Sequence, residues 1–204
     1  MAGKIEKKNR KSLWLVIAAL CVAAAVVVVL RLLGDKGPLG TPTLTVETPE
    51  KCSAGEEITL DVTISDMGEA LYPAASMSIR FDPACLEFLA VDEGNVFILD
   101  GESTSGRQLP QWSYNTAACN ESGLINIMYL DMTGGRYAFS RELLAEEDNV
   151  VLRLKFRLRG SVRSGDICDL IFDDAVFAAS DETQSLAMTT DTLNVRDGKI
   201  VIGE

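Results

Sequence analysis

Short runs in which apolar and polar residues alternate recur along most of this 204-residue chain. The run at 57–65, EITLDVTIS, places an apolar side chain at every second position, and the run at 75–81 repeats the pattern. An alternation of period two is typical of a β-strand that buries one face and exposes the other. Turn residues separate nine such runs, which are 44–46, 57–65, 75–81, 86–91, 111–116, 124–130, 150–158, 169–177 and 198–202. Nine short half-buried strands predict an all-β fold, a two-sheet antiparallel sandwich.

The alternation breaks abruptly inside the segment FDPACLEFLAVDEGNVF at 81–97. Pro83 cannot donate to a β ladder and it holds Asp82 extended, so a strand must end at Phe81. Apolar residues resume at Leu86, at the start of the next run. We interpret this break as a corner at which the chain passes from one sheet to the other.

The chain divides by composition into four parts. A basic segment at 1–12 precedes an apolar segment at 13–33, a Gly/Pro linker follows at 34–43, and the predicted sandwich occupies 44–204. Within the sandwich we expect one helix, at 140–148 (SRELLAEED), with Ser140 as its N-cap.

The apolar segment predicts an uncleaved transmembrane signal anchor. Eighteen residues without a charge, Leu13 to Leu30, would span about 27 Å as a helix, close to the hydrocarbon thickness of a bilayer. A cleavable signal peptide has an apolar stretch of only about 7–15 residues and a small-residue cleavage site, and no such site follows here. Basic residues are more numerous before the segment than after it, which predicts a cytoplasmic N-terminus and an extracellular domain on a single-pass cell-membrane protein.

Charge and composition exclude several functions. Residues 41–204 carry 12 Lys and Arg against 28 Asp and Glu, so a nucleic-acid partner is not expected. The chain has no His, which removes Ser-His and Cys-His nucleophile pairs and imidazole metal ligands. Acidic pairs such as Asp173-Asp174 are interpreted as solvated loop charge. We therefore expect a protein that is not an enzyme.

Four segments resemble the cohesin domain family, the receptor modules of cellulosome scaffoldins. The corner segment at 81–97 is similar to the cohesin pattern [YF]-D-P-x-x-L-E-[VF] and its continuation. Three later segments fall in the cohesin order, namely YNTAACNESGLINIMYLDMTGG (114–135), NVVLRLKFRLRG (149–160) and NVRDGKIVIG (194–203).

The resemblance implies a nine-stranded sandwich of jelly-roll topology that binds a dockerin domain on one flat sheet. It also implies that no cofactor is needed in this chain and that calcium belongs to the dockerin. The absence of a D-x-[DN]-x-[DN]-G loop from the sequence agrees with this. The expected function is a membrane-anchored extracellular module that holds dockerin-bearing enzymes or scaffolds at a bacterial cell surface. The alternative is a carbohydrate-binding or adhesion β-sandwich.

The strand alternation also assigns the outward-facing side chains. In the runs 75–81 and 124–130 the apolar positions form the inward set. The outward set consists of Ser76, Ser78, Arg80, Asn126, Met128 and Leu130. These predict a flat, partly apolar patch suited to binding a helix, unless a loop covers its methionine and leucine.

Comparison with the family refines this patch. By the resemblance, Met128 matches an apolar dockerin contact and Asp131 an acidic one. Ser76 and Ala74 stand where many cohesins carry Asp and Asn, which leaves the class of dockerin open.

Two aromatic residues leave a second use open. Trp112 and Tyr114 lie on one side of the predicted strand 111–116. If they are exposed they suit stacking on sugar rings, and if they are inward they belong to the core.

Four cysteines lie in the predicted exported part, each in a loop after an odd-numbered strand. The cohesin strand order implies the disulfides Cys85–Cys168 and Cys52–Cys119, and the alternative is four reduced thiols. A zinc site is not expected because the sequence contains no C-x-x-C pair.

Overall fold

The computed structural model describes residues 40–95, 110–144, 149–183 and 185–203. All of them belong to one of two compact units of the chain, Gly40–Glu204. The predicted signal anchor at 13–33 and the basic segment at 1–12 lie outside the described residues. In the described ranges we find no helix with the length and apolar character needed to cross a bilayer.

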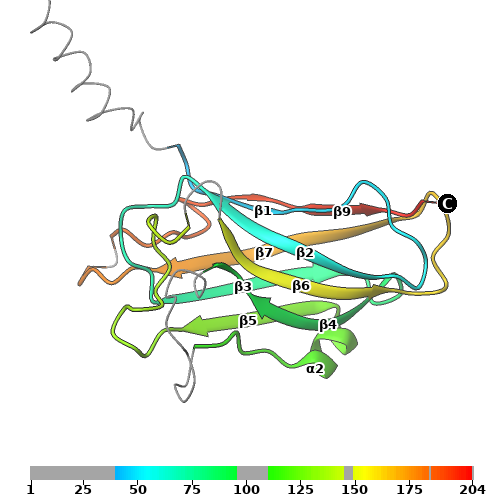
Figure 1. Cartoon of the computed structure of the whole chain (residues 1–204), viewed down its shortest axis with the longest axis horizontal. Helices are drawn as coiled ribbons and strands as arrows, with labels where there is room; N and C mark the ends of the chain where they lie inside the picture. The colour runs from blue at the N-terminus through cyan, green and yellow to red at the C-terminus, as the bar shows by residue number, and fades with distance from the viewer. Residues whose placement is uncertain (1–39, 96–109, 145–148, 184, 204) are drawn as a thin grey trace, which may run out of the picture. The chain divides into compact units, whose positions relative to one another are not determined.

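Within the described ranges, nine strands form two facing sheets (Figure 1). The five-stranded sheet has the order β4-β6-β2-β1-β8 and the four-stranded sheet the order β5-β3-β7-β9. The strands are β1 Thr43–Val46, β2 Glu57–Ser65, β3 Ala74–Phe81, β4 Leu86–Glu93, β5 Leu124–Leu130, β6 Val150–Leu158, β7 Ile167–Ala178, β8 Asn194–Arg196 and β9 Gly198–Val201. Neighbouring strands are antiparallel except β1 and β8, which pair in parallel. The predicted nine-stranded all-β sandwich is confirmed, with this one parallel pair as an exception to the expected antiparallel order.

One predicted strand, at 111–116, is not present. In the run 111–116 only Ser113 makes a β-bridge, to Met128 of β5, and the chain then forms helix α2, Thr116–Ser122. Asn115 caps the helix by accepting a hydrogen bond from the Ala118 N–H at 3.1 Å. Gly123 ends it in the left-handed region at φ 68°, which glycine adopts without steric cost. Figure 1 shows α2 beside β4 and β5, the two strands that it contacts.

The helix predicted at 140–148 is not present where the structure describes that segment. Residues 141–144 form turns, and 145–148 lie outside the described residues. The turn begins at Ser140, whose side chain accepts a hydrogen bond from the Leu143 N–H at 3.3 Å. Ser140 therefore caps a turn here and not a helix.

The corner at Asp82-Pro83 connects the two sheets, as predicted. Strand β3 of the four-stranded sheet ends at Phe81, and β4 of the five-stranded sheet begins at Leu86. The Asp82 carbonyl accepts hydrogen bonds from the N–H groups of Cys85 at 3.0 Å and Leu86 at 2.9 Å. These two hydrogen bonds form the turn between the sheets. The residues of the corner therefore determine where β4 begins.

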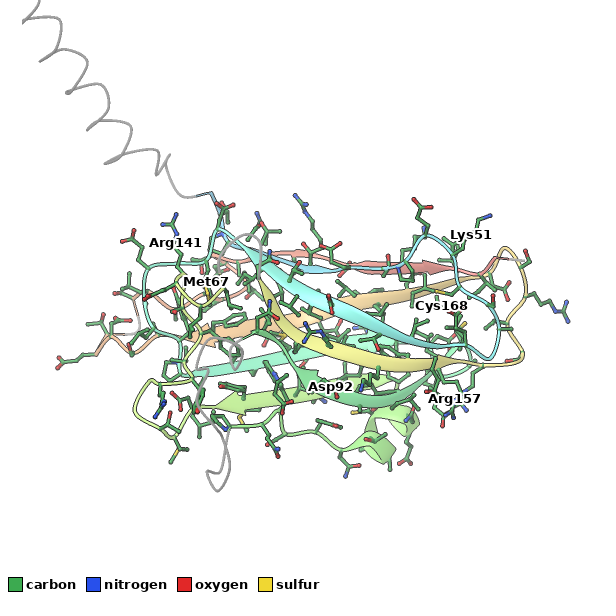
Figure 2. All side chains as sticks on the ribbon, viewed as in Figure 1. Lys51, Met67, Asp92, Arg141, Arg157 and Cys168 are labelled. Carbon is green, nitrogen blue, oxygen red and sulfur yellow. The ribbon has the colours of Figure 1, made fainter. Side chains whose placement is uncertain are left out.

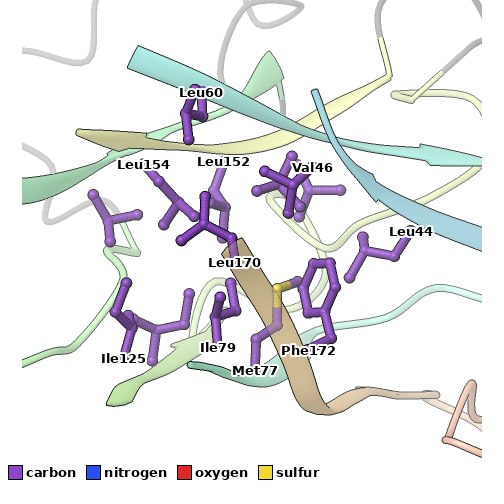
Figure 3. Close-up of a cluster of buried hydrophobic side chains, with 14 of the residues drawn as sticks. Leu44, Val46, Leu60, Met77, Ile79, Ile125, Leu152, Leu154, Leu170 and Phe172 are labelled. Atoms are coloured by element: carbon purple, nitrogen blue, oxygen red, sulfur yellow. The ribbon is translucent and has the colours of Figure 1, made fainter. Parts of the chain in front are cut away.

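The core fills the space between the sheets (Figure 3). Leu60 and Leu154 reach inward from the five-stranded sheet, and Ile79 and Leu170 reach inward from the four-stranded sheet, all with no exposed surface. Burial of each such aliphatic side chain contributes about 1.5–3 kcal/mol. Because these residues occupy alternate positions of their strands, their neighbours in sequence must point to the two outer faces.

Candidate functional site

The outward side chains of β5, β3 and β7 form one continuous surface, which we name the β5–β3–β7 face. The strand register arranges it in rows. Ser76 lies between Met128 and Val176, and in the next row Ser78 lies between Asn126 and Asp174. The rows bring together the six outward residues predicted from alternation, namely Ser76, Ser78, Arg80, Asn126, Met128 and Leu130. The structure thus confirms their common orientation.

The β5 side of this face is apolar and open to solvent. Met128 is 59% exposed and Leu130 is 52% exposed, so no loop of the described chain covers them. Their cross-strand neighbours on β3 are small, Ser76 and Ala74. The long side chains of Met128 and Leu130 thus stand beside shorter ones, and another apolar surface can pack against them.

The centre of the face is polar. The Ser78 hydroxyl donates a hydrogen bond to Oδ1 of Asn126 at 2.8 Å. Arg80 contacts both carboxylate oxygens of Asp173 at 2.6 Å. A β-bulge in the β3–β7 pairing next to Ser78 places Asp173 and Asp174 outward in succession, where strict alternation would turn one of them inward. This part of the face therefore offers donors, acceptors and carboxylates to a partner.

Asp131, the seventh predicted contact residue, lies elsewhere. It is buried, and its Oδ1 accepts hydrogen bonds from the N–H of Thr133 at 2.8 Å and from the Thr133 hydroxyl. Its Oδ2 accepts a hydrogen bond from the Tyr137 N–H at 3.2 Å. The carboxylate is occupied by the loop that follows β5, so in this structure Asp131 shapes that loop beneath the surface.

Sequence reasoning missed other exposed apolar residues of this surface. Met132 is 81% exposed and continues the alternation of Met128 and Leu130 beyond the end of β5. On β7, Ile171 is 38% exposed and lies beside Arg80. The continued alternation was a readable signal for Met132. Ile171 lies between the buried Leu170 and Phe172, so its outward direction was also readable from alternation.

The opposite outer face, on the five-stranded sheet, carries ion pairs between its strands. Arg157 of β6 contacts Glu57 of β2 and Glu87 of β4, and Lys155 contacts Asp92 at 2.5 Å. Hydrogen bonding to Glu57 raises the pKa of the Arg157 guanidinium. This face therefore presents paired charges, whereas the β5–β3–β7 face presents exposed Met128 and Leu130 beside its own ion pair.

The distribution of exposed apolar residues separates the two faces further. Among the described strand residues, only Val195 of β8 is a large exposed apolar residue on the five-stranded sheet. The four-stranded sheet carries Met128, Leu130, Ile167, Ile171 and Val201. This apolar bias makes the four-stranded sheet the better candidate for a protein-binding surface.

Trp112 and Tyr114, the two aromatic residues considered for sugar stacking, do not form an exposed aromatic surface. Trp112 is 5% exposed and packs against Tyr129 and Phe139, with ring centroids at 5.3 and 6.0 Å. Tyr114 is 36% exposed and packs edge-on against Phe88 at 5.6 Å. Trp112 belongs to the core and is not available to stack on a sugar ring, which weakens the carbohydrate-binding alternative.

The four cysteines are free thiols in this structure. Cys85 and Cys168, an expected pair, are in hydrogen-bond contact. Cys52 bridges to Ile202 beside β9, whereas Cys119 lies on α2 against β5, so they sit at opposite edges of the four-stranded sheet. This topology argues against the expected Cys52–Cys119 disulfide. In the part of the chain that the structure describes, no cluster of acidic or thiol groups is arranged to hold a metal ion.

Comparison with protein families gives one match, to the cohesin domain, over residues 42–200. No curated protein sequence matches the chain.

Comparison with solved structures identifies the same fold. The third cohesin of ScaC from Acetivibrio cellulolyticus, solved in complex with the ScaB dockerin, is 18% identical with a TM-score of 0.58. The OlpA cohesin of Clostridium thermocellum, in complex with a dockerin, gives the same two values, and in both cases the match covers 80% of this chain and 99% of the other. The CaCohA2 cohesin of Clostridium acetobutylicum, in complex with a single-residue variant of CaDoc0917, is 20% identical with a TM-score of 0.56, covering 79% of this chain and 99% of that one.

Proposed function

The chain belongs to the cohesin domain family, and from this premise we propose that its β-sandwich binds a dockerin domain through the β5–β3–β7 face. The family is one of non-catalytic binding modules, and several solved relatives are held in complexes with dockerins. In such a complex this chain supplies a rigid sheet and the dockerin supplies the calcium sites.

One observation carries the choice of face. Met128 and Leu130 are half-exposed or more on a regular strand, beside small residues and next to hydrogen-bonding groups at the centre. An interface needs an apolar core with a few fixed polar groups around it. The ion-paired outer face of the five-stranded sheet does not offer that combination.

We further propose that the apolar segment at 13–33 anchors this domain at the outer face of a bacterial cell membrane. The support is the eighteen uncharged residues and the basic segment before them. A linker at 34–43 would keep the dockerin-bearing enzyme or scaffold close to the bilayer. Protease treatment of intact cells that express the full chain tests this placement: the sandwich should be digested from outside, and protection until lysis would contradict it.

The binding proposal is tested by a pull-down of purified full chain, in mild detergent, against a panel of dockerins with calcium or with a chelator. We expect capture of at least one dockerin with calcium and loss of capture with the chelator, because the calcium loops fold the dockerin. Binding only to polysaccharide, or to no dockerin of any class, would overturn the proposal.

A further inference from the structure

Two cysteine side chains meet at the end of the sandwich where β3 turns into β4. Cys85 lies in the turn that follows Pro83, and Cys168 is the second residue of β7 (Figure 2). Phe81 pairs with Leu170 at the end of the β3–β7 ladder, so the corner runs alongside the start of β7. The two thiols are in hydrogen-bond contact with each other.

A carboxylate completes this group. The Cys85 thiol donates to Oδ2 of Asp82 at 3.5 Å, and the Cys168 side chain interacts with the Cys85 thiol on its other side. The other oxygen of Asp82, Oδ1, accepts a hydrogen bond from the Ala84 N–H at 2.8 Å, which holds the carboxylate in place. The corner that separates the two sheets therefore also positions an acceptor against the thiol pair.

The two thiols differ in access and in acidity. Cys168 is 1% exposed, and burial raises its pKa to about 12. Cys85 is half-buried, and its pKa is also raised, chiefly by burial and further by Asp82. The hydrogen bond from Cys168 acts in the other direction and lowers the pKa of Cys85. Cys85 is thus the thiol that solvent reaches.

We propose that Cys85 and Cys168 are a disulfide-forming pair, in which Cys85 reacts first, Cys168 completes the bond, and Asp82 slows the reaction. The oxidant is a low-molecular-weight disulfide such as glutathione disulfide. The Cys85 thiolate attacks one sulfur of the oxidant and releases one glutathione thiolate. The Cys168 thiolate then attacks Sγ of Cys85, forms the protein disulfide and releases the second glutathione thiolate. The two cysteines lose two protons and two electrons, and both electrons leave on the two glutathione thiols.

The bond would join the inter-sheet corner to β7, a strand of the β5–β3–β7 face. It would enclose the segment between Cys85 and Cys168, and cross-links that close long loops stabilise the folded state by restricting the unfolded chain. The inference does not depend on dockerin binding, since it rests only on the contacts of these side chains.

The experiment is incubation of the full chain with glutathione disulfide, followed by proteolysis without reduction and mass spectrometry. We expect a cross-linked peptide pair that contains Cys85 and Cys168, and a melting temperature raised by about 5–15 °C. A Cys52→Ser/Cys119→Ser variant should behave in the same way. In Cys168→Ser, Cys85 should stop at a glutathione adduct. Folded protein in which both cysteines stay reduced, or in which each carries its own adduct, would overturn the pairing.

The role of Asp82 is tested by Asp82→Asn, which keeps an oxygen to accept the Ala84 N–H. Without the negative charge, Cys85 should ionise at lower pH and react several-fold faster near neutral pH, with its rate–pH profile displaced toward acid. Because a general loosening of the corner would raise the rate without moving the profile, the displacement is the decisive readout. A rate–pH profile that is the same in Asp82→Asn as in the wild type would contradict the proposed role of Asp82.

Discussion

Asp131 and Tyr137 are joined across the loop that follows β5, where the buried Asp131 carboxylate accepts the Tyr137 N–H at 3.2 Å. The carbonyl of Tyr137 accepts in turn from the Tyr129 hydroxyl at 2.6 Å. Both backbone groups of Tyr137 are thus bound by side chains from β5 or its end. The loop that carries exposed Met132 is held against the sheet by this arrangement.

Asp131→Ala should therefore destabilise the domain. The substitution leaves the Thr133 and Tyr137 N–H groups without their acceptor, and we expect the free energy of unfolding to fall by about 1–3 kcal/mol. Urea denaturation measures the change. Asp174→Ala, at an exposed acidic residue of β7, is the matched control and should change stability by less than about 0.5 kcal/mol. Equal effects of the two variants would contradict a structural role for Asp131.

Trp112→Ala should act on folding and not on a ligand. Trp112 packs between Tyr129 and Phe139 in the core, and its truncation is expected to cost about 3–5 kcal/mol of stability. Thermal unfolding followed by near-ultraviolet circular dichroism measures this loss. A fully stable variant that had lost binding to a polysaccharide would restore the sugar-stacking alternative.

The turn after β7 should weaken in acid. The carboxylate of Asp181 accepts hydrogen bonds from the hydroxyl of Thr183 at 2.7 Å and the N–H of Ser185 at 2.9 Å, and these bonds lower its pKa, with Thr183 as the largest cause. Because the folded-state pKa lies below the ordinary value of 3.8, the stabilisation is present above about pH 4 and is lost as pH falls through the folded-state pKa.

Denaturation of the wild type and of Asp181→Asn between about pH 2 and pH 6 checks this prediction. The two stability curves should be separated at the upper end and converge at the lower end. Curves that stay parallel over the whole range would show that ionisation of Asp181 does not contribute.

The sequence predicted the strands well because burial acts through a local pattern. The alternation in 57–65 and 150–158 gave the bounds of β2 and β6 as the structure has them. Pro83 marked the end of β3 and the start of β4 for a steric reason that needs no tertiary information. The alternation of apolar and polar residues is also local, so the outward side of β3 and β5 could be assigned before the sheets were known.

Other features depended on contacts that a local pattern does not contain. The aromatic alternation of Trp112 and Tyr114 suggested a strand, although Asn115 and Gly123 carried the cap signals of helix α2. The family resemblance placed Asp131 among the contact residues. Its buried position could not be read from the sequence, because the N–H groups that bind its carboxylate reach it only when the following loop turns back. The separation of Cys52 from Cys119 likewise depends on the order of strands in the sheet.

The central claim is that the β5–β3–β7 face binds a dockerin, and its most direct test is a calorimetric titration of a captured dockerin with Met128→Asp. Met128 is 59% exposed, so the substitution leaves the fold intact while it places a charge in the apolar part of the interface. Val195→Asp, at an exposed apolar residue of β8 in the other sheet, is the control. We predict that Met128→Asp weakens binding by at least about thirtyfold, or about 2 kcal/mol, and that Val195→Asp binds as the wild type does. Wild-type affinity in Met128→Asp would contradict the account, and so would an equal loss of binding in the two variants.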